Sequence, residues 1–126
     1  MNYLLDTDIC IYIIKRRPES VYKRLREMSI DDVAVSSLTF AEMAYGAEKS
    51  AQAERNRTKL TEFLAPFRIL PFDGSAALVY GEIRARLEKL GKPIGGIDML
   101  VAAQAVAEDI TLVSNNTREF GRIPNL

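Results

Sequence analysis

The chain has 126 residues, with 17 basic and 17 acidic side chains, one cysteine and no histidine. Its length fits one domain over residues 1–126, its 48% hydrophobic content excludes a disordered chain, and its zero net charge excludes a global attraction to nucleic acid. The missing histidine excludes Ser-His-Asp and Cys-His catalysis and the usual zinc sites, so any chemistry has to use carboxylates, amines, hydroxyls or an oxygen-bound metal ion.

Short apolar strands alternate with amphipathic helices along the chain. We expect strands at 3–5, 33–35, 68–71 and 111–113, and helices at 9–14, 18–28, 37–47, 60–67, 75–90 and 98–107. Ser36 and Ser37 are candidate N-caps for the third of these helices, and Gly91 followed by Pro93 predicts the end of the fifth. Fully apolar short strands between helices indicate a parallel sheet covered on both faces, an α/β sandwich.

Polar side chains stand where the predicted strands end. Asp6 follows the first strand, Glu42 lies in the helix after the second, Asp98 begins a helix after a glycine-rich loop, and Asn116 follows the last strand. Active sites of open parallel sheets form beyond the carboxyl ends of the strands, at the switch in strand order. We therefore expect these four side chains to face one rim of the sheet.

A cluster of carboxylates needs a compensating charge at neutral pH. Oxygen ligands without histidine or cysteine select a hard cation, Mg²⁺ or Mn²⁺ as a substitute. Such a site activates water and neutralises charge on a phosphodiester, so the pattern predicts metal-dependent phosphodiester hydrolysis.

Each of these residues also has a purely structural interpretation. Asp6 and Asp98 are possible helix N-caps, and Glu42 is placed to form a capping box with Thr39, three residues before it. Asn116 is equally a turn residue in a polar loop.

Four segments of the sequence resemble one known family. They are residues 4–12 (LLDTDICIY), 41–47 (AEMAYGA), 91–98 (GKPIGGID) and 114–120 (SNNTREF). In this order and spacing they resemble the PIN-domain ribonucleases, in particular the VapC toxins of bacterial type II toxin–antitoxin pairs. The resemblance extends over nearly the whole chain.

The resemblance implies a PIN-like three-layer sandwich with about five parallel strands. It implies a toxin that is a metal-dependent endoribonuclease acting on single-stranded or looped RNA, and it favours the anticodon stem-loop of initiator tRNA as the substrate. It also implies a homodimer, inhibition by a cognate VapB antitoxin, and a higher assembly that binds operator DNA through the antitoxin.

The resemblance also assigns roles to residues. Asp6 and Asp98 match direct Mg²⁺ ligands, Glu42 matches a ligand of the metal or of its water, and Asn116 stands where many PIN domains have a fourth acid. This neutral amide favours one firmly bound ion. Asp8 stands where close relatives often have asparagine, so we expect a supporting charge there.

Further side chains are candidates for supporting roles. Thr7 and Ser114 are placed to orient a ligand or water, with turn capping as the alternative. Lys15, Arg16 and Arg17 begin a run of cations that is typical either of a solvated helix face or of contacts to RNA phosphates. Tyr45 is a candidate for stacking on an unpaired base, with core or interface packing as the alternative.

Two other function classes stay open at this point. Asp6 and Asp8 after an apolar strand also resemble the opening motif of haloacid-dehalogenase-type phosphatases, in which the first aspartate is a nucleophile. A PIN module that only binds RNA or protein, without catalysis, is the other alternative.

The sequence shows no sign of export or of membrane insertion. No apolar run approaches the about 18 residues of a membrane helix, and the first residues lack the pattern of a secretory signal. Cys10 is the only cysteine, which excludes an intramolecular disulfide and favours a reducing compartment. We therefore expect a cytoplasmic protein that has no membrane partner.

Overall fold

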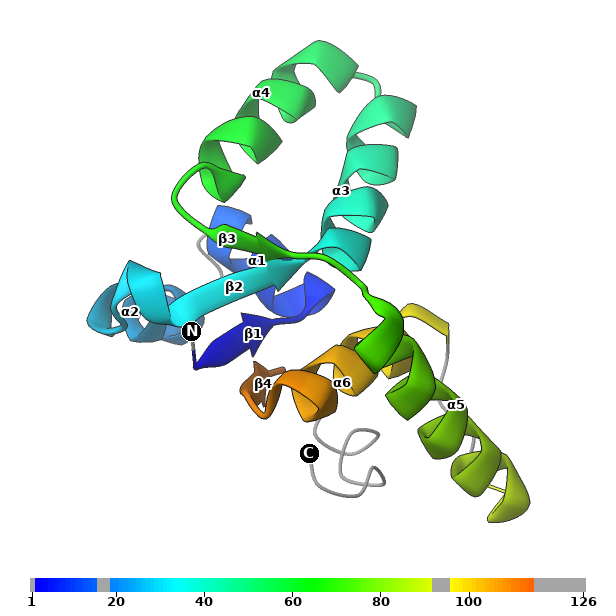
Figure 1. Cartoon of the computed structure of the whole chain (residues 1–126). Coiled ribbons are helices and arrows are strands. Elements are labelled where there is room, and N and C mark those ends of the chain that lie inside the picture. The colour runs from blue at the N-terminus through cyan, green and yellow to red at the C-terminus, as the bar shows by residue number, and fades with distance from the viewer. Residues whose placement is uncertain (1, 16–18, 92–95, 115–126) are drawn as a thin grey trace.

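We describe a computed structural model of the chain (Figure 1), which covers residues 2–15, 19–91 and 96–114, with backbone alone for residues 20–22. Its elements are β1 (Tyr3–Leu5), α1 (Thr7–Lys15), α2 (Glu19–Glu27), the short 3-10 helix η1 (Ile30–Asp32), β2 (Val33–Ser36), α3 (Ser37–Lys49), α4 (Ala53–Leu64), β3 (Arg68–Leu70), α5 (Gly74–Lys89), α6 (Gly96–Glu108) and β4 (Thr111–Val113). The four predicted strands are confirmed to within one residue.

The described strands form one parallel sheet with the order β3-β2-β1-β4. Leu4 of β1 lies opposite Ala34 of β2 on one side and Leu112 of β4 on the other. The chain moves from β1 outward to β2 and β3, then returns past β1 to β4. The switch point therefore lies between β1 and β4, where a site is expected. Four strands are described where about five were expected, and residues 115–126 lie outside the described part.

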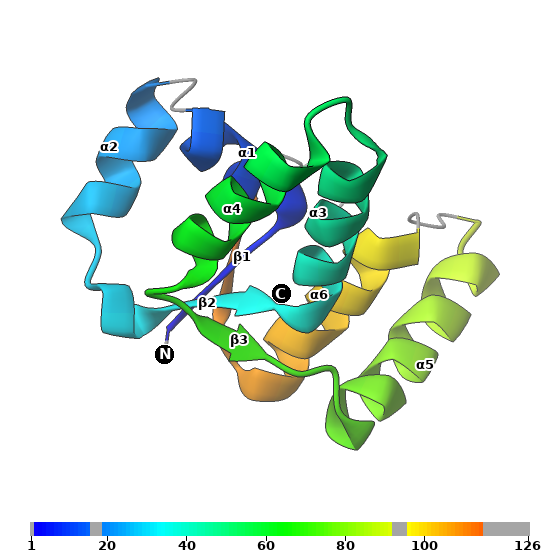
Figure 2. The ribbon, with the colours of Figure 1, turned by 90° about the horizontal axis from the view of Figure 1, so that it is seen from above.

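Helices cover both faces of the sheet (Figures 1 and 2). Because side chains alternate along a strand, Leu5 and Val35 face one core, which α1 and α4 complete. Leu4 and Ala34 face the opposite core, which is filled by Val101 and Ala105 of α6. A third cluster joins α6 to α5, the outermost helix on that side. This arrangement confirms the α/β architecture and leaves the carboxyl ends of β1 and β4 at one edge.

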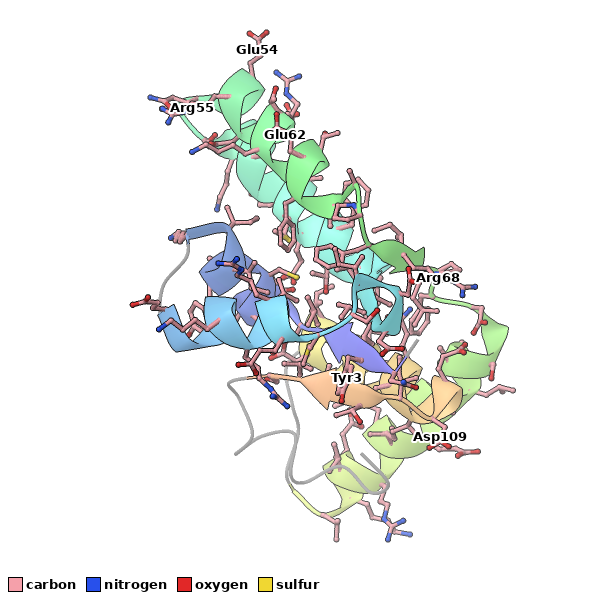
Figure 3. All side chains as sticks on the ribbon, turned by 90° about the vertical axis from the view of Figure 1, so that its left-hand side faces the viewer. Tyr3, Glu54, Arg55, Glu62, Arg68 and Asp109 are labelled. Carbon is pink, nitrogen blue, oxygen red and sulfur yellow. The ribbon has the colours of Figure 1, made fainter. Side chains whose placement is uncertain are left out.

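Helices α3 and α4 form an antiparallel hairpin that projects from the sheet (Figures 1 and 2). The sequence predicts the second of them only from residue 60, because the residues before it are polar and exposed. The helix begins at Ala53 instead. Within it, the hydroxyls of Thr58 and Thr61 donate hydrogen bonds to the backbone carbonyls four residues earlier. Figure 3 shows Glu54 and Arg55 at the tip of the hairpin, away from Tyr3 and Arg68 of the sheet.

Two helix ends follow the predicted signals. Ser36 is the N-cap of α3, and its hydroxyl oxygen accepts the backbone N–H of Leu38 at 3.0 Å. Gly91 lies just after the C-cap of α5 and has a φ of +69°, the left-handed conformation that ends a helix. The cap at the other end of α5, Asp73, was not predicted; its Oδ1 accepts the N–H of Ala76 at 3.0 Å. In the described part of the chain, no helix has the length and apolar character needed to cross a membrane.

Candidate active site

Asp6 lies at the centre of the sheet edge, directly after β1. Its side chain is 3% exposed, and Oδ1 accepts the backbone N–H of Ile9 at 2.8 Å, which makes it the N-cap of α1. The hydroxyl of Ser114, which follows β4, donates a second hydrogen bond to the carboxylate. The structural interpretation of Asp6 as a cap is thus confirmed. Because an ionised carboxylate accepts more than two hydrogen bonds, Asp6 keeps free lone pairs for a further ligand at the switch point of the sheet.

The buried position of Asp6 has an electrostatic cost. Burial raises the pKa of this carboxyl group above its usual value, and the nearby charge of Asp8 raises it further. The hydrogen bonds from Ser114 and from the backbone of Ile9 offset only part of this effect. None of the salt bridges within the described residues involves Asp6. A cation placed here would supply the missing opposite charge.

Glu42 is held at the same edge by Thr7. The hydroxyl of Thr7, the first residue of α1, donates to Oε1 of Glu42 at 2.7 Å and lies 3.4 Å from the hydroxyl of Thr39, which is fully buried. Because the N-cap of α3 is Ser36, Thr39 is inside the helix and the predicted capping box with Glu42 does not form. Thr7 thus orients Glu42, as Ser114 contacts Asp6, whereas the contact of Thr7 with the buried Thr39 was not predicted.

Asp98 occupies the first turn of α6. The helix begins two residues earlier than expected, at Gly96, so Asp98 is its third residue and not its N-cap. The side chain is half-buried. A carboxylate in a first turn is favoured by the partial positive charge of the helix N-terminus, which leaves its position compatible with a ligand role.

A buried polar network connects the elements that carry Glu42 and Asp98. The side chain of Gln104 in α6 accepts a hydrogen bond from the hydroxyl of Ser36 and donates one to the carbonyl of Leu70 at 3.1 Å. Gln104 is 1% exposed and Ser36 fully buried. The network was not predicted, and its signal in the sequence is a single glutamine within the apolar run of residues 99–106.

The chemistry of the donor set fits a divalent cation. All of the candidate ligands are carboxylate oxygens, which hard cations prefer. In the described part of the chain, however, no three His, Cys, Asp or Glu side chains gather closely enough to hold a metal ion. The structure instead joins Glu42 to Thr7 and Asp6 to Ser114. The three-carboxylate ligand set stays a prediction.

A cleft extends from this edge between α1, α3 and α4. It has a volume of about 680 Å³ and is lined by Thr7, Asp8 and Glu42 at one end. Lys15 and Tyr45, both predicted RNA contacts, also line it. Tyr45 is 66% exposed, so the alternative of core packing is wrong for this side chain. The remaining candidates Arg16, Arg17 and Asn116 lie outside the described residues.

The comparison with protein families decides the classification. The family model described as "PIN domain" matches residues 3–126. The chain belongs to the PIN domain family. The PIN-domain ribonucleases generally depend on divalent metal ions, in agreement with the oxygen-rich edge.

Named relatives place the chain among the VapC ribonucleases. It is 45% identical over 127 residues to "Ribonuclease VapC2" of Rickettsia felis and 40% identical over 126 residues to "tRNA(fMet)-specific endonuclease VapC" of Shigella flexneri, covering 100% of this chain and 95% of each relative. A crystal structure of VapBC2 from Rickettsia felis, bound to a DNA fragment from its promoter, has a TM-score of 0.92 and 44% identity over 100% of this chain and 96% of that one. These comparisons support the endoribonuclease hypothesis and neither of its alternatives.

Proposed function

We propose that this PIN domain is the toxin of a type II toxin–antitoxin pair, a Mg²⁺-dependent endoribonuclease for which Mn²⁺ is a substitute. The observation that carries the proposal is the buried Asp6 carboxylate at the switch point of the sheet, with Thr7 holding Glu42 at the same edge. The relative from Shigella flexneri is named for cleavage of initiator tRNA. We therefore propose the anticodon stem-loop of that tRNA as substrate.

The proposed mechanism assigns a separate task to each side chain. Asp6 and Asp98 would hold the cation, and Glu42 would bind it or its water. Thr7 keeps Glu42 in place, Ser114 contacts Asp6, and Asp8 adds a further negative charge beside Asp6. When bound, the cation neutralises phosphodiester charge and lowers the pKa of water. One carboxylate accepts the proton of the attacking water, and attack at phosphorus leaves a 5′-phosphate and a 3′-hydroxyl. Asn116 in place of a fourth acid supports a single ion.

The proposed partners follow from the relatives. The structure from Rickettsia felis is a VapBC complex on promoter DNA. We propose that this chain likewise forms a homodimer in the cytoplasm, that a cognate VapB antitoxin inhibits it, and that the assembly binds operator DNA through the antitoxin. Sedimentation equilibrium of the toxin alone and with its antitoxin tests the proposed stoichiometry.

Cleavage assays with matched variants test the proposed chemistry. Purified protein is incubated with initiator tRNA in Mg²⁺, in Mn²⁺ and in EDTA, and the 5′ ends of the products are mapped. We expect cleavage only with a divalent ion, and a loss of about a hundredfold or more for Asp6→Asn and Asp98→Asn.

The matched control is Asp73→Asn, which makes the same chemical change at the exposed N-cap of α5. It is expected to keep cleavage within a few-fold of the wild type. Cleavage by Asp6→Asn within about tenfold of the wild type, or undiminished cleavage in EDTA, contradicts the proposal.

A further inference from the structure

The cleft between α1, α3 and α4 is lined by side chains of both charges, carboxylates and lysines. Two carboxylates, Asp8 and Glu42, line it together with three lysines, Lys15, Lys49 and Lys59. Glu42 and Lys49 are seven residues apart on α3, which separates them by about 10 Å along the helix axis. Lysine charge therefore begins two turns beyond the proposed metal-binding carboxylate, on the same groove.

The three lysines of the cleft have no carboxylate partner in the described structure. The ion pairs found there are Lys23–Glu19, Arg24–Glu27, Arg57–Glu48 and Arg84–Glu88. The charge of Glu48, the acid next to Lys49 in sequence, is thus compensated by Arg57 from the facing helix. Lys15, Lys49 and Lys59 remain available for an anionic ligand from outside.

The cleft also offers apolar and aromatic surface. Its lining includes Ile11, Met43 and Leu60, one from each helix, and the ring of Tyr45. Tyr45 is 66% exposed, and Nζ of Lys49 lies 5.2 Å from its ring centroid. This cation–π contact positions the ring beside a positive charge. Exposed aromatic rings beside lysines are the arrangement with which proteins bind unpaired bases and their phosphates.

We propose that this cleft binds the single-stranded RNA segment that flanks the scissile phosphate, with Lys49 and Lys59 at its phosphates and Tyr45 stacked on a base. The inference rests on the proposed ribonuclease function. It adds Lys49 and Lys59 of the α3–α4 hairpin to the contacts predicted from the sequence. The volume of about 680 Å³ lies in the range of about 300–1,000 Å³ typical of ligand pockets, which suits splayed bases of a loop.

The charge pattern favours RNA over a peptide as the occupant. Three exposed lysines that have no carboxylate partner among the described residues favour an occupant with repeated negative charge, and a polynucleotide carries one on every residue. A segment of antitoxin that filled this cleft would need acidic side chains opposite the lysines. Binding of a synthetic antitoxin peptide is therefore measured beside binding of RNA.

RNA binding is measured with a fluorescein-labelled anticodon stem-loop of initiator tRNA, by anisotropy at several KCl concentrations, in full-length protein carrying Asp98→Asn to prevent cleavage. We expect Lys49→Gln/Lys59→Gln to weaken binding about tenfold and to reduce the slope of log affinity against log salt by about 0.7 for each lost contact. Tyr45→Ala is expected to lose about tenfold, and Tyr45→Phe to bind like the parent protein.

The control pair is Arg55→Gln/Lys89→Gln, which removes the same charge outside the cleft. Arg55 is at the tip of the hairpin and Lys89 ends α5, as Figure 3 shows for Arg55. We expect its affinity and salt slope to match the parent, and circular dichroism checks the fold of every variant. If the Lys49/Lys59 variant binds RNA with unchanged affinity and slope, the inference is wrong. It is also wrong if that variant impairs only the binding of the antitoxin peptide.

Cleavage by the otherwise wild-type chain separates this inference from the proposed function. Wild-type cleavage of the stem-loop combined with normal RNA binding by the Lys49/Lys59 variant overturns the cleft assignment alone. A wild-type chain that neither binds nor cleaves this RNA overturns both proposals.

Discussion

At the scale of single residues, Asp6 has a structural task as a helix cap and is also a carboxylate proposed to bind a metal ion. It caps α1 through the N–H of Ile9, a structural task, and it is 3% exposed at the sheet edge. Burial raises the pKa of its carboxyl group, so the ionised form is disfavoured in the folded protein. An asparagine at this position keeps the cap acceptor but carries no charge to bury.

We therefore expect Asp6→Asn to stabilise the protein at neutral pH without metal. A folded-state pKa above the unfolded one means that the wild type loses stability as pH rises through the interval between the two values. The advantage of Asp6→Asn is present above that interval and disappears below the ordinary pKa of aspartate. Urea midpoints in EDTA, at neutral and at acid pH, measure it.

Divalent metal is expected to reverse this order. At a metal concentration of about a hundredfold the dissociation constant, binding stabilises the wild type by about 2.7 kcal/mol, and the variant gains little. A lower midpoint for Asp6→Asn in EDTA at neutral pH contradicts this electrostatic account of the site.

At the scale of elements, two glycines of the α5 region show opposite requirements. Gly91 follows the helix with a φ of +69°, and Gly81 lies inside the helix with a regular conformation. A Cβ atom at either position meets no atom within 4 Å. The two sites therefore differ in backbone conformation and not in available space.

Replacing each glycine by alanine isolates this difference. We expect Gly91→Ala to destabilise the protein by about 1 kcal/mol, because alanine is strained in the left-handed region. Gly81→Ala is expected to stabilise it by about 0.5–1 kcal/mol through its higher helix propensity. Urea unfolding of both variants measures the effects, and equal signs for the two substitutions refute the explanation.

The helices also show which helix ends could be predicted from the sequence. Gly91 and Ser36 give local signals because one residue supplies the required backbone conformation or cap. The start of α4 at Ala53 gives none, since its first turns are exposed and bury no apolar stripe. The candidate carboxylates came from local signals too, namely the end of a strand for Asp6 and the first turns of a helix for Glu42 and Asp98, and their metal-binding role stays a prediction. The contacts of Thr39 and Gln104 could not be predicted in this way, because their partners are 32 and 68 residues away.

At the scale of the whole molecule, the sheet separates the core under α1 and α4 from the two clusters around α6 and α5 on its other face. Leu64 of α4 is 6% exposed in the core on one face, and Leu87 of α5 is 1% exposed in the cluster beyond α6 on the other. Parallel pairing of β1 with both β2 and β4 links these cores. We propose that residues 1–126 fold as one cooperative domain.

Leu64→Ala and Leu87→Ala test this cooperativity. Each is expected to cost about 2–5 kcal/mol and to move one common transition, observed identically by circular dichroism and tyrosine fluorescence. Leu78→Ala, at a position that is 75% exposed, is the control and is expected to stay within about 0.5 kcal/mol of the wild type. Two separate transitions in either core variant exclude a single cooperative unit.

The strand order also has a consequence for biosynthesis. β1 leaves the ribosome before the other described strands, yet one of its neighbours, β4, is the last of them, and the N–H of Asp6 donates to the carbonyl of Val113 at 3.2 Å. A nascent chain that stops before Val113 lacks that backbone partner and also the Ser114 hydroxyl that binds the Asp6 carboxylate. The proposed nuclease centre therefore assembles only late in translation, and prematurely released fragments are expected to be harmless to the cell that makes them.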